Sequence, residues 1–168
     1  MKHTISVLVE NHAGVLSKIS GLFSRRGFNI DSLAVGVTED AGISRMTIVV
    51  DGDDYLVEQM EKQLNKLIDV IKVKTIKPGQ IIARELVLVK VSSTAAQRGE
   101  IMNIAEIMGA SIIDISPTTL TLQFADTAEQ VDLFEKLLRQ YKIREVVRTG
   151  TVALEKGVDT IDQKVRKF

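Results

Sequence analysis

The chain of 168 residues contains the same order of strand-like and helix-like segments twice. Apolar residues alternate in the strand-like segments and recur every three or four residues in the helix-like ones. Each half, of about eighty residues, therefore reads strand, helix, strand, strand, helix, strand. This order predicts an α+β protein with two ferredoxin-like βαββαβ domains in tandem. Hydrophobic residues make up 45% of the chain, which is enough for a packed core.

The predicted strands of the first half are residues 4–9, 29–37, 44–50 and Val70–Ile76. A helix between the first two strands stops at Gly27, and another carries an apolar stripe over residues 57–68. The predicted strands of the second half are residues 85–91, Ser111–Ile115, 118–124 and 143–152. One helix there stops at Gly109, and the run Thr127-Ala128-Glu129-Gln130 predicts a capping box at the start of the other.

The run Lys77-Pro78-Gly79 separates the two halves, because adjacent Pro and Gly interrupt regular structure. We therefore expect a first domain over residues 1–77 and a second domain over residues 83–157. Residues 158–168 are polar and charged, and we expect them to form a loosely held tail.

The turn Asn11-His12-Ala13-Gly14, between the first strand and the first helix, is suited to an anionic ligand. Free N–H groups and the positive end of the helix dipole point out of such a turn. Gly14 lets a ligand approach the backbone closely, and the apolar Val15 and Leu16 follow it. These residues favour a small amphipathic carboxylate over a nucleotide. They also fit a purely structural role, with Asn11 as a helix cap and Gly14 shaping the turn.

The corresponding turn of the second half reads Ser92-Ser93-Thr94-Ala95 and lacks both Asn and Gly. The repeat is therefore structural, and only the first half carries the candidate site. The carboxylates Asp51, Asp53 and Asp54 fit a turn and a helix cap better than a pair for general acid–base catalysis.

Composition argues against several classes of function. Lys and Arg together equal Asp and Glu at 22 each, which is not the balance of a nucleic-acid-binding surface. The absence of cysteine excludes disulfides, thiolate nucleophiles and Cys-based metal sites. No apolar stretch approaches a membrane span and no signal peptide is recognisable, so we expect a soluble cytoplasmic protein. His3 and His12 have no partner pattern, so we expect surface or turn roles for them, with no metal site and no catalytic site.

Three segments of the first half match a known family in order and spacing: Asn11-x-x-Gly14-Val15-Leu16, residues 21–33 and Ser44-Arg45-Met46-Thr47-Ile48. They resemble the small regulatory subunit of acetolactate synthase (acetohydroxyacid synthase), and residues 61–67, 85–91 and 112–117 are similar to further segments of it. The resemblance extends from Met1 to about Gly157. It implies that the first half is an ACT domain, a βαββαβ module that binds small metabolites, usually amino acids.

The resemblance also implies a regulatory subunit of a transferase complex, without a catalytic site of its own. The catalytic large subunit of this family holds thiamine diphosphate, Mg²⁺ and FAD, and we expect no cofactor in this chain. That subunit condenses two pyruvates, or pyruvate with 2-oxobutyrate, in the biosynthesis of valine, leucine and isoleucine. The small subunit raises this activity and confers feedback inhibition, most often by valine.

ACT domains of this family pair across a homodimer, with the effector sites at the interface. The family's effector residues match Asn11, Gly14, Val15 and Leu16 on one chain, and Asn29 and Ile30 on the other. An amino-acid carboxylate would take the N–H groups near Gly14. The side-chain oxygens of Asn11 and Asn29 would accept from its ammonium group. Val15 and Ile30 would shape an apolar slot for its side chain.

Three alternatives stay open from the sequence. The chain could be a stand-alone, amino-acid-binding ACT regulator of another metabolic enzyme. It could be an RNA-binding domain, since that class shares the fold, but such domains stack bases on strand aromatics and residues 44–50 contain none. It could also be an enzyme in its own right, which acetolactate formation by the chain alone would reveal.

Overall fold

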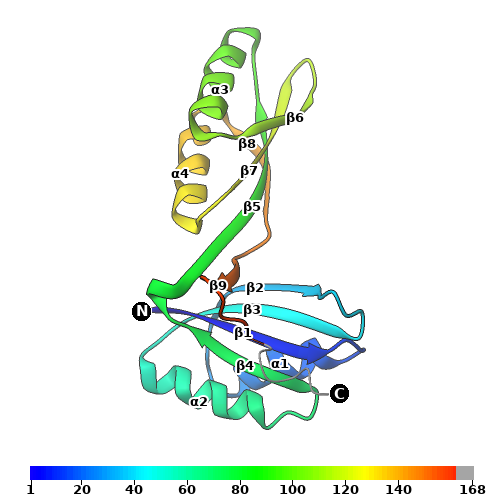
Figure 1. Cartoon of the computed structure of the whole chain (residues 1–168). Coiled ribbons are helices and arrows are strands. Elements are labelled where there is room, and N and C mark those ends of the chain that lie inside the picture. The colour runs from blue at the N-terminus through cyan, green and yellow to red at the C-terminus, as the bar shows by residue number, and fades with distance from the viewer. Residues whose placement is uncertain (162–168) are drawn as a thin grey trace. The chain divides into compact units, whose positions relative to one another are not determined.

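The computed structural model describes residues 1–161 (Figure 1), and residues 162–168 of the predicted tail lie outside the described residues. The chain divides into two compact units. The first unit contains Met1–Ile82 together with residues 151–161, and the second contains Ala83–Gly150. Each unit has the βαββαβ order, which confirms the predicted tandem of α+β folds.

The first unit is a four-stranded antiparallel sheet with strand order β2-β3-β1-β4. The order arises because β1 pairs with β3 in the middle of the sheet, while β2 lies at the edge beside β3 and β4 at the edge beside β1. Its elements are β1 (Lys2–Glu10), α1 (Val15–Arg25), β2 (Ile30–Val37), β3 (Ile43–Asp51), α2 (Asp54–Asn65) and β4 (Val70–Ile76).

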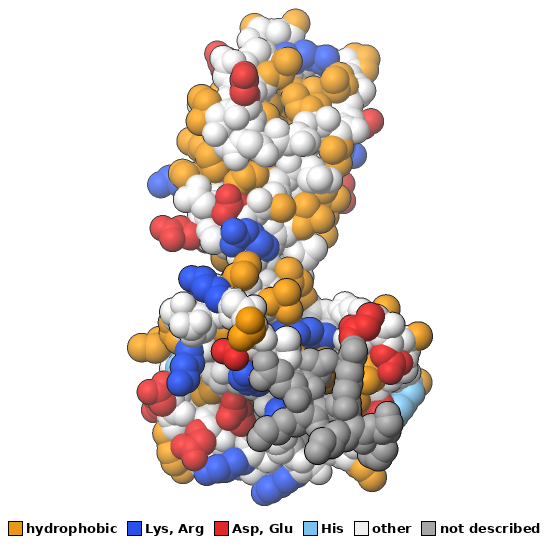
Figure 2. Space-filling view, viewed as in Figure 1, with side chains coloured by type: hydrophobic (Ala, Val, Ile, Leu, Met, Phe, Trp, Pro, Cys, Tyr) orange, Lys and Arg blue, Asp and Glu red, His pale blue; other side chains and the backbone are white. Residues whose placement is uncertain are grey.

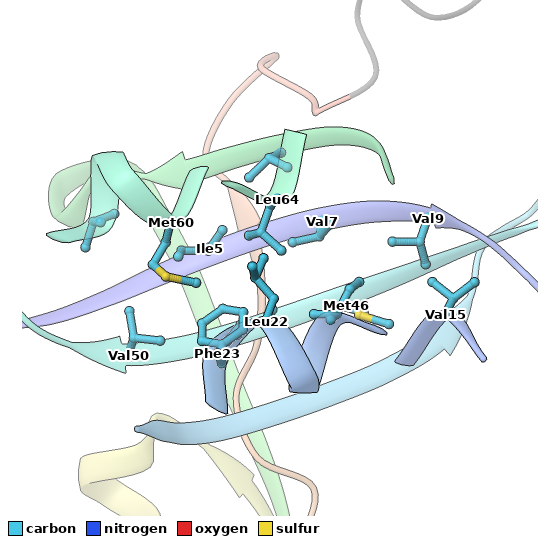
Figure 3. Close-up of a cluster of buried hydrophobic side chains, with 14 residues drawn as sticks. Ile5, Val7, Val9, Val15, Leu22, Phe23, Met46, Val50, Met60 and Leu64 are labelled. Carbon is cyan, nitrogen blue, oxygen red and sulfur yellow. The ribbon is translucent and has the colours of Figure 1, made fainter. Parts of the chain in front are cut away.

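The core of the first unit lies between the sheet and its two helices (Figure 3). Alternate residues of β1 point into it, because side chains of a strand alternate between the two faces of a sheet. Burying each large apolar side chain contributes about 1.5–3 kcal/mol. The buried side chains include Ile5, Val7, Val9, Val15, Leu22, Phe23, Met46, Val50, Met60 and Leu64.

The chain returns to the first unit after Gly150, so the division differs from the expected second domain of residues 83–157. The predicted strand 143–152 is accordingly divided into β8 (Ile143–Arg148) and β9 (Val152–Glu155). Three contacts bind the returning segment to the first sheet: Thr151 N–H to Ser32 Oγ (2.8 Å), Arg45 to the Ala153 carbonyl (3.0 Å), and Lys74 Nζ to the Glu155 carboxylate (2.7 Å).

These contacts lie on the sheet face opposite the helices, since Ser32, Arg45 and Lys74 alternate with the core-facing residues of their strands. Local sequence patterns could not place this segment, because its partners lie far away in the chain. Of the expected tail, residues 158–161 are described, and Ile161 is buried rather than loosely held.

The second unit repeats the arrangement with strand order β6-β7-β5-β8. Its core is a separate apolar cluster in which Phe124 and Phe134 pack with ring centroids 4.7 Å apart. Its elements are β5 (Ile81–Ser92), α3 (Ala95–Met108), β6 (Ser111–Ile115), β7 (Thr119–Asp126), α4 (Ala128–Leu138), the 3-10 turn η2 (Arg139–Tyr141) and β8. A 3-10 turn, η1 (Pro78–Gln80), precedes β5 and coincides with the predicted break between the halves.

Candidate functional site

The turn between β1 and α1 presents an open helix N-terminus. Gly14 is the N-cap residue with φ 88°, a left-handed conformation that favours glycine, and it has no side chain to cap the helix. The first hydrogen bond of the helix runs from Lys18 N–H to the Gly14 carbonyl (3.1 Å). Within residues 1–161, the N–H groups of Val15, Leu16 and Ser17 make no hydrogen bond. Three donors at the positive end of the dipole can therefore receive an anion.

Asn11 fixes this turn to the hairpin between β2 and β3. Its main-chain N–H donates to the Gly42 carbonyl (2.8 Å), and its side-chain Nδ2 donates to the Ala41 carbonyl (2.9 Å). With the amide nitrogen used in this way, the Oδ1 atom is left as an acceptor on an exposed residue. Asn11 thus holds the turn in place and offers one oxygen to a ligand.

The two apolar residues after Gly14 have different surroundings. The Val15 side chain is only 3% exposed and belongs to the core, so it offers a ligand its main-chain N–H rather than an apolar surface. Leu16 is 45% exposed and is the apolar surface beside the open helix end. The expected slot formed by the Val15 side chain is therefore not formed in the single chain.

Asn29 and Ile30 lie at the opposite end of the same sheet. Ile30 is level with His3, because both pair with Val50 of β3. Asn11 lies eight residues beyond His3 along β1, which at about 3.3 Å per residue is about 26 Å. Asn29 is exposed and donates from Nδ2 to Asp31 (3.0 Å), while Ile30 packs against the core. A single chain therefore does not bring the two predicted groups of residues together.

His12 lies in the same turn, within a cluster of charged side chains that sequence patterns did not reveal. Its Nε2 is 3.2 Å from Glu10 Oε2 and 2.9 Å from Asp69 Oδ1. Lys18 Nζ is 2.8 Å from the other oxygen of Asp69. The Asp69 carboxylate is only 8% exposed and comes just before β4, so its approach to His12 follows from the pairing of β1 with β4. No local signal joins residues this far apart in the chain.

The hydrogen bonds that the His12 ring donates raise its pKa. The largest contribution is the bond to the Ala13 carbonyl and the next is the bond to the Glu10 carboxylate, and Asp69 adds to the effect. The Lys18 ammonium lowers the pKa of Asp69, and His12 lowers it further. The ligand atoms of Glu10, His12 and Asp69 lie within 4.8 Å of one another, a spacing that a metal ion could bridge. The Lys18 ammonium already forms an ion pair with Asp69, so the geometry favours a network of ion pairs over a metal site.

The carboxylates after β3 act as the turn and cap that the sequence predicted. Asp53 Oδ1 accepts from the Leu56 N–H (2.8 Å) and caps α2. Asp54 lies in the first turn of α2, where the helix dipole favours a negative charge. A groove of about 950 Å³ lies on the far face of the sheet, lined in part by Leu8, Arg45 and Ile161, and contains none of the predicted site residues.

The distribution of surface charge and the length of the helices can be compared with the expectation that the chain binds neither nucleic acid nor a membrane. Basic and acidic side chains are interspersed on the face shown in Figure 2, in keeping with the zero net charge. Among residues 1–161, no helix has the length and apolar character needed to cross a membrane.

The family comparisons agree with this geometry. The family described as "AHAS small subunit-like ACT domain" matches residues 5–72, so the first unit is an ACT domain. The family described as "Small subunit of acetolactate synthase" matches residues 84–157. The chain therefore belongs to the acetolactate synthase small subunits, the regulatory class of that enzyme.

Relatives and a solved structure support the assignment over nearly the whole chain. A probable acetolactate synthase small subunit of Archaeoglobus fulgidus is 51% identical, over 94% of this chain and 98% of that protein. The acetolactate synthase isozyme 3 small subunit of Salmonella typhimurium is 46% identical, over 94% and 97%. The crystal structure of the acetolactate synthase small subunit from Thermotoga maritima has a TM-score of 0.89 at 40% identity, over 94% and 98%.

Proposed function

We propose that this chain raises the activity of an acetolactate synthase catalytic subunit and transmits feedback inhibition by valine or another branched-chain amino acid. The observation that carries the proposal is the open N-terminus of α1, where three N–H donors surround the exposed Gly14. Family membership implies a catalytic large subunit as partner. We expect thiamine diphosphate, Mg²⁺ and FAD on that subunit.

The effector fits this turn by its charges. Its carboxylate would accept from the N–H groups of Val15, Leu16 and Ser17, at the positive end of the dipole. Its ammonium group would donate to Asn11 Oδ1, the oxygen left as an acceptor by the bond to Ala41. Its branched side chain would contact Leu16. One methylene changes the binding free energy by about 1–3 kcal/mol, so the binding free energies of leucine and valine should differ by no more than this.

The edge strand β2 supports a site completed by a second copy of the chain. It ends the strand order β2-β3-β1-β4, and its Val35 and Val37 are 48% and 65% exposed. Such an edge is a template for pairing with another strand. Two-fold pairing would run two β2 strands antiparallel and set Ile30 of one copy near Val37 of the other. Asn29 of the second copy would then reach the end of the sheet where Asn11 lies.

Mixing two inactive variants tests the two-chain site directly. Gly14→Asp, which repels the effector's carboxylate, and Asn29→Lys, which replaces an acceptor for its ammonium group by a second cation, should each abolish valine binding measured by isothermal titration. Co-refolding them in equal amounts should restore about a quarter of the sites, because half of the random dimers are mixed and each mixed dimer keeps one unaltered pair. If the mixture binds no valine although each variant remains a folded dimer, the site is not shared between two chains.

The regulatory role is tested with the catalytic subunit present. Acetolactate formation should rise when the chain is added and fall again when valine is added. Valine binding without any effect on this activity would favour the alternative of a stand-alone ACT regulator of another enzyme. Acetolactate formation by the chain alone would contradict a purely regulatory role.

A further inference from the structure

The imidazole of His12 has an oxygen acceptor at each of its two nitrogens. Nδ1 is 3.2 Å from the Ala13 carbonyl oxygen. Nε2 is 3.2 Å from Glu10 Oε2 and 2.9 Å from Asp69 Oδ1. A neutral imidazole has one N–H and one lone pair, so only the imidazolium can donate from both nitrogens. The geometry is that of a protonated ring.

The charges around the ring lead to the same form. Two carboxylates face the cluster, Glu10 at the end of β1 and Asp69 before β4, and one ammonium faces it, Lys18 on α1. With His12 protonated, two negative and two positive groups balance. With His12 neutral, one negative charge remains beside the open helix end, and it would repel an incoming carboxylate.

The ring also holds the backbone that forms the open helix end. The Ala13 carbonyl belongs to the peptide group that leads into Gly14, the N-cap residue with the left-handed φ of 88°. Glu10 is bound in turn to the segment before β4, because its N–H donates to the Asp69 carbonyl (2.9 Å). A protonated ring therefore connects the Ala13 carbonyl to Glu10 of β1 and to Asp69 before β4, and loss of the proton removes at least one of these connections.

We propose that His12 is a further residue of the effector site, a positioning residue whose protonated ring favours binding of an amino-acid carboxylate at Gly14. This inference rests on the proposed function. Effector binding is then linked to protonation, and the linkage is reciprocal: bound effector holds the proton on His12 more tightly. The chain with effector bound should take up a fraction of a proton at neutral pH.

Calorimetry of the full chain with valine between about pH 5.5 and about pH 8 tests the proposal, since imidazole is the group that titrates there. The wild-type affinity should fall about fivefold or more as the pH rises across this range. The variant His12→Gln keeps an amide that can donate to a carboxylate but does not titrate, so its affinity should stay nearly constant. His3→Gln is the matched control, because His3 lies at the far end of the sheet and its Nε2 faces the Gly52 carbonyl. It should behave as wild type.

Imidazole NMR gives a second readout that a merely structural residue would not change. The chain has two histidines, so one variant assigns both ring signals. The pKa of His12 should rise on adding valine. A wild-type affinity that is independent of pH, or a His12→Gln profile that still follows the wild type, would overturn the inference and leave the proposed function standing. Failure of valine and leucine to bind at any pH would overturn both.

Discussion

The two turns that lead into α1 and α3 occupy equivalent places in the two units, and both are anchored alike. In the first, Asn11 N–H donates to the Gly42 carbonyl (2.8 Å), and in the second, Ser93 N–H donates to the Thr118 carbonyl (2.9 Å). They differ at the N-cap. Gly14 has a left-handed backbone and no capping side chain, whereas Thr94 is extended and caps α3 with its hydroxyl.

The cap of α3 is a complete capping box. Thr94 Oγ1 accepts from the Gln97 N–H (3.3 Å), and Gln97 Oε1 accepts from the Thr94 N–H (3.1 Å). The Gln97 N–H of that helix end is thus bound by a side chain of the chain itself, whereas no side chain caps α1. The comparison teaches that two copies of one fold can differ in whether a helix end is capped, when the turn that leads into the helix and its N-cap residue differ.

The largest expected effect comes from filling the open helix end. Gly14→Asp places a carboxylate where the effector's own would bind, so the valine dissociation constant should rise at least about 100-fold. A Cβ at Gly14 meets no atom within 4 Å, so steric strain within the chain is not the cause. The left-handed backbone should still cost about 1–2 kcal/mol of unfolding free energy.

Two controls separate charge from backbone strain. Thr94→Asp introduces the same charge at the equivalent position of α3 and should leave valine binding unchanged. Gly109→Ala imposes a similar backbone strain within the second unit, since Gly109 has φ 75° and open space around it. Loss of valine binding in either control would contradict the comparison between the two turns.

A smaller loss is expected at the residue that anchors the turn. Asn11→Ala removes the acceptor for the ammonium group and the bond to the Ala41 carbonyl, and should weaken valine binding about tenfold. Ser93→Ala changes the equivalent residue of the second unit and should have no effect on binding. Isothermal titration with valine measures the affinity of both variants. Equal losses of affinity would indicate that Asn11 acts through the general stability of the chain.

A change at the capped N-terminus of α3 should affect the stability of the second unit and not the binding of valine. Thr94→Ala removes the hydroxyl that accepts from the Gln97 N–H and should destabilise the second unit by about 1 kcal/mol. Hydrogen exchange of the first-turn amides of α3 measures this, with valine affinity as the second readout. A changed affinity would mean that the two helix ends are not independent.

The smallest effect concerns the ion pair beside the turn. Lys18 lowers the folded-state pKa of Asp69, so the pair stabilises the fold above the unfolded pKa of Asp69 and this contribution is lost as the pH falls through the folded value. Lys18→Met should therefore lower stability at neutral pH but not in strong acid. Lys62→Met is the control, because Lys62 pairs with Glu58 on an exposed helix face. Denaturant unfolding at several pH values measures the free energy of unfolding. Its loss relative to the wild type at neutral pH should be larger for Lys18→Met than for Lys62→Met.

Local patterns were sufficient for most of the fold. The periodicity of residues 44–50 and 57–68 predicted β3 and α2 because burial imposes that spacing on any strand or helix. The predicted capping box at Thr127 is incomplete, since its N–H already donates to Asp126 (2.7 Å) and only the bond from Gln130 N–H (3.4 Å) forms. The contacts of the segment after Gly150 with the first sheet could not be predicted in this way, because its partners are strands far earlier in the chain.

The sequence by itself determined the two βαββαβ units and the difference between their N-caps, since these depend on neighbouring residues and their side-chain period. Only the tertiary structure placed Val15 in the core, Asn29 at the far end of the sheet from Asn11, and Asp69 beside His12. Strand pairing sets these distances, and pairing joins residues that no local pattern connects.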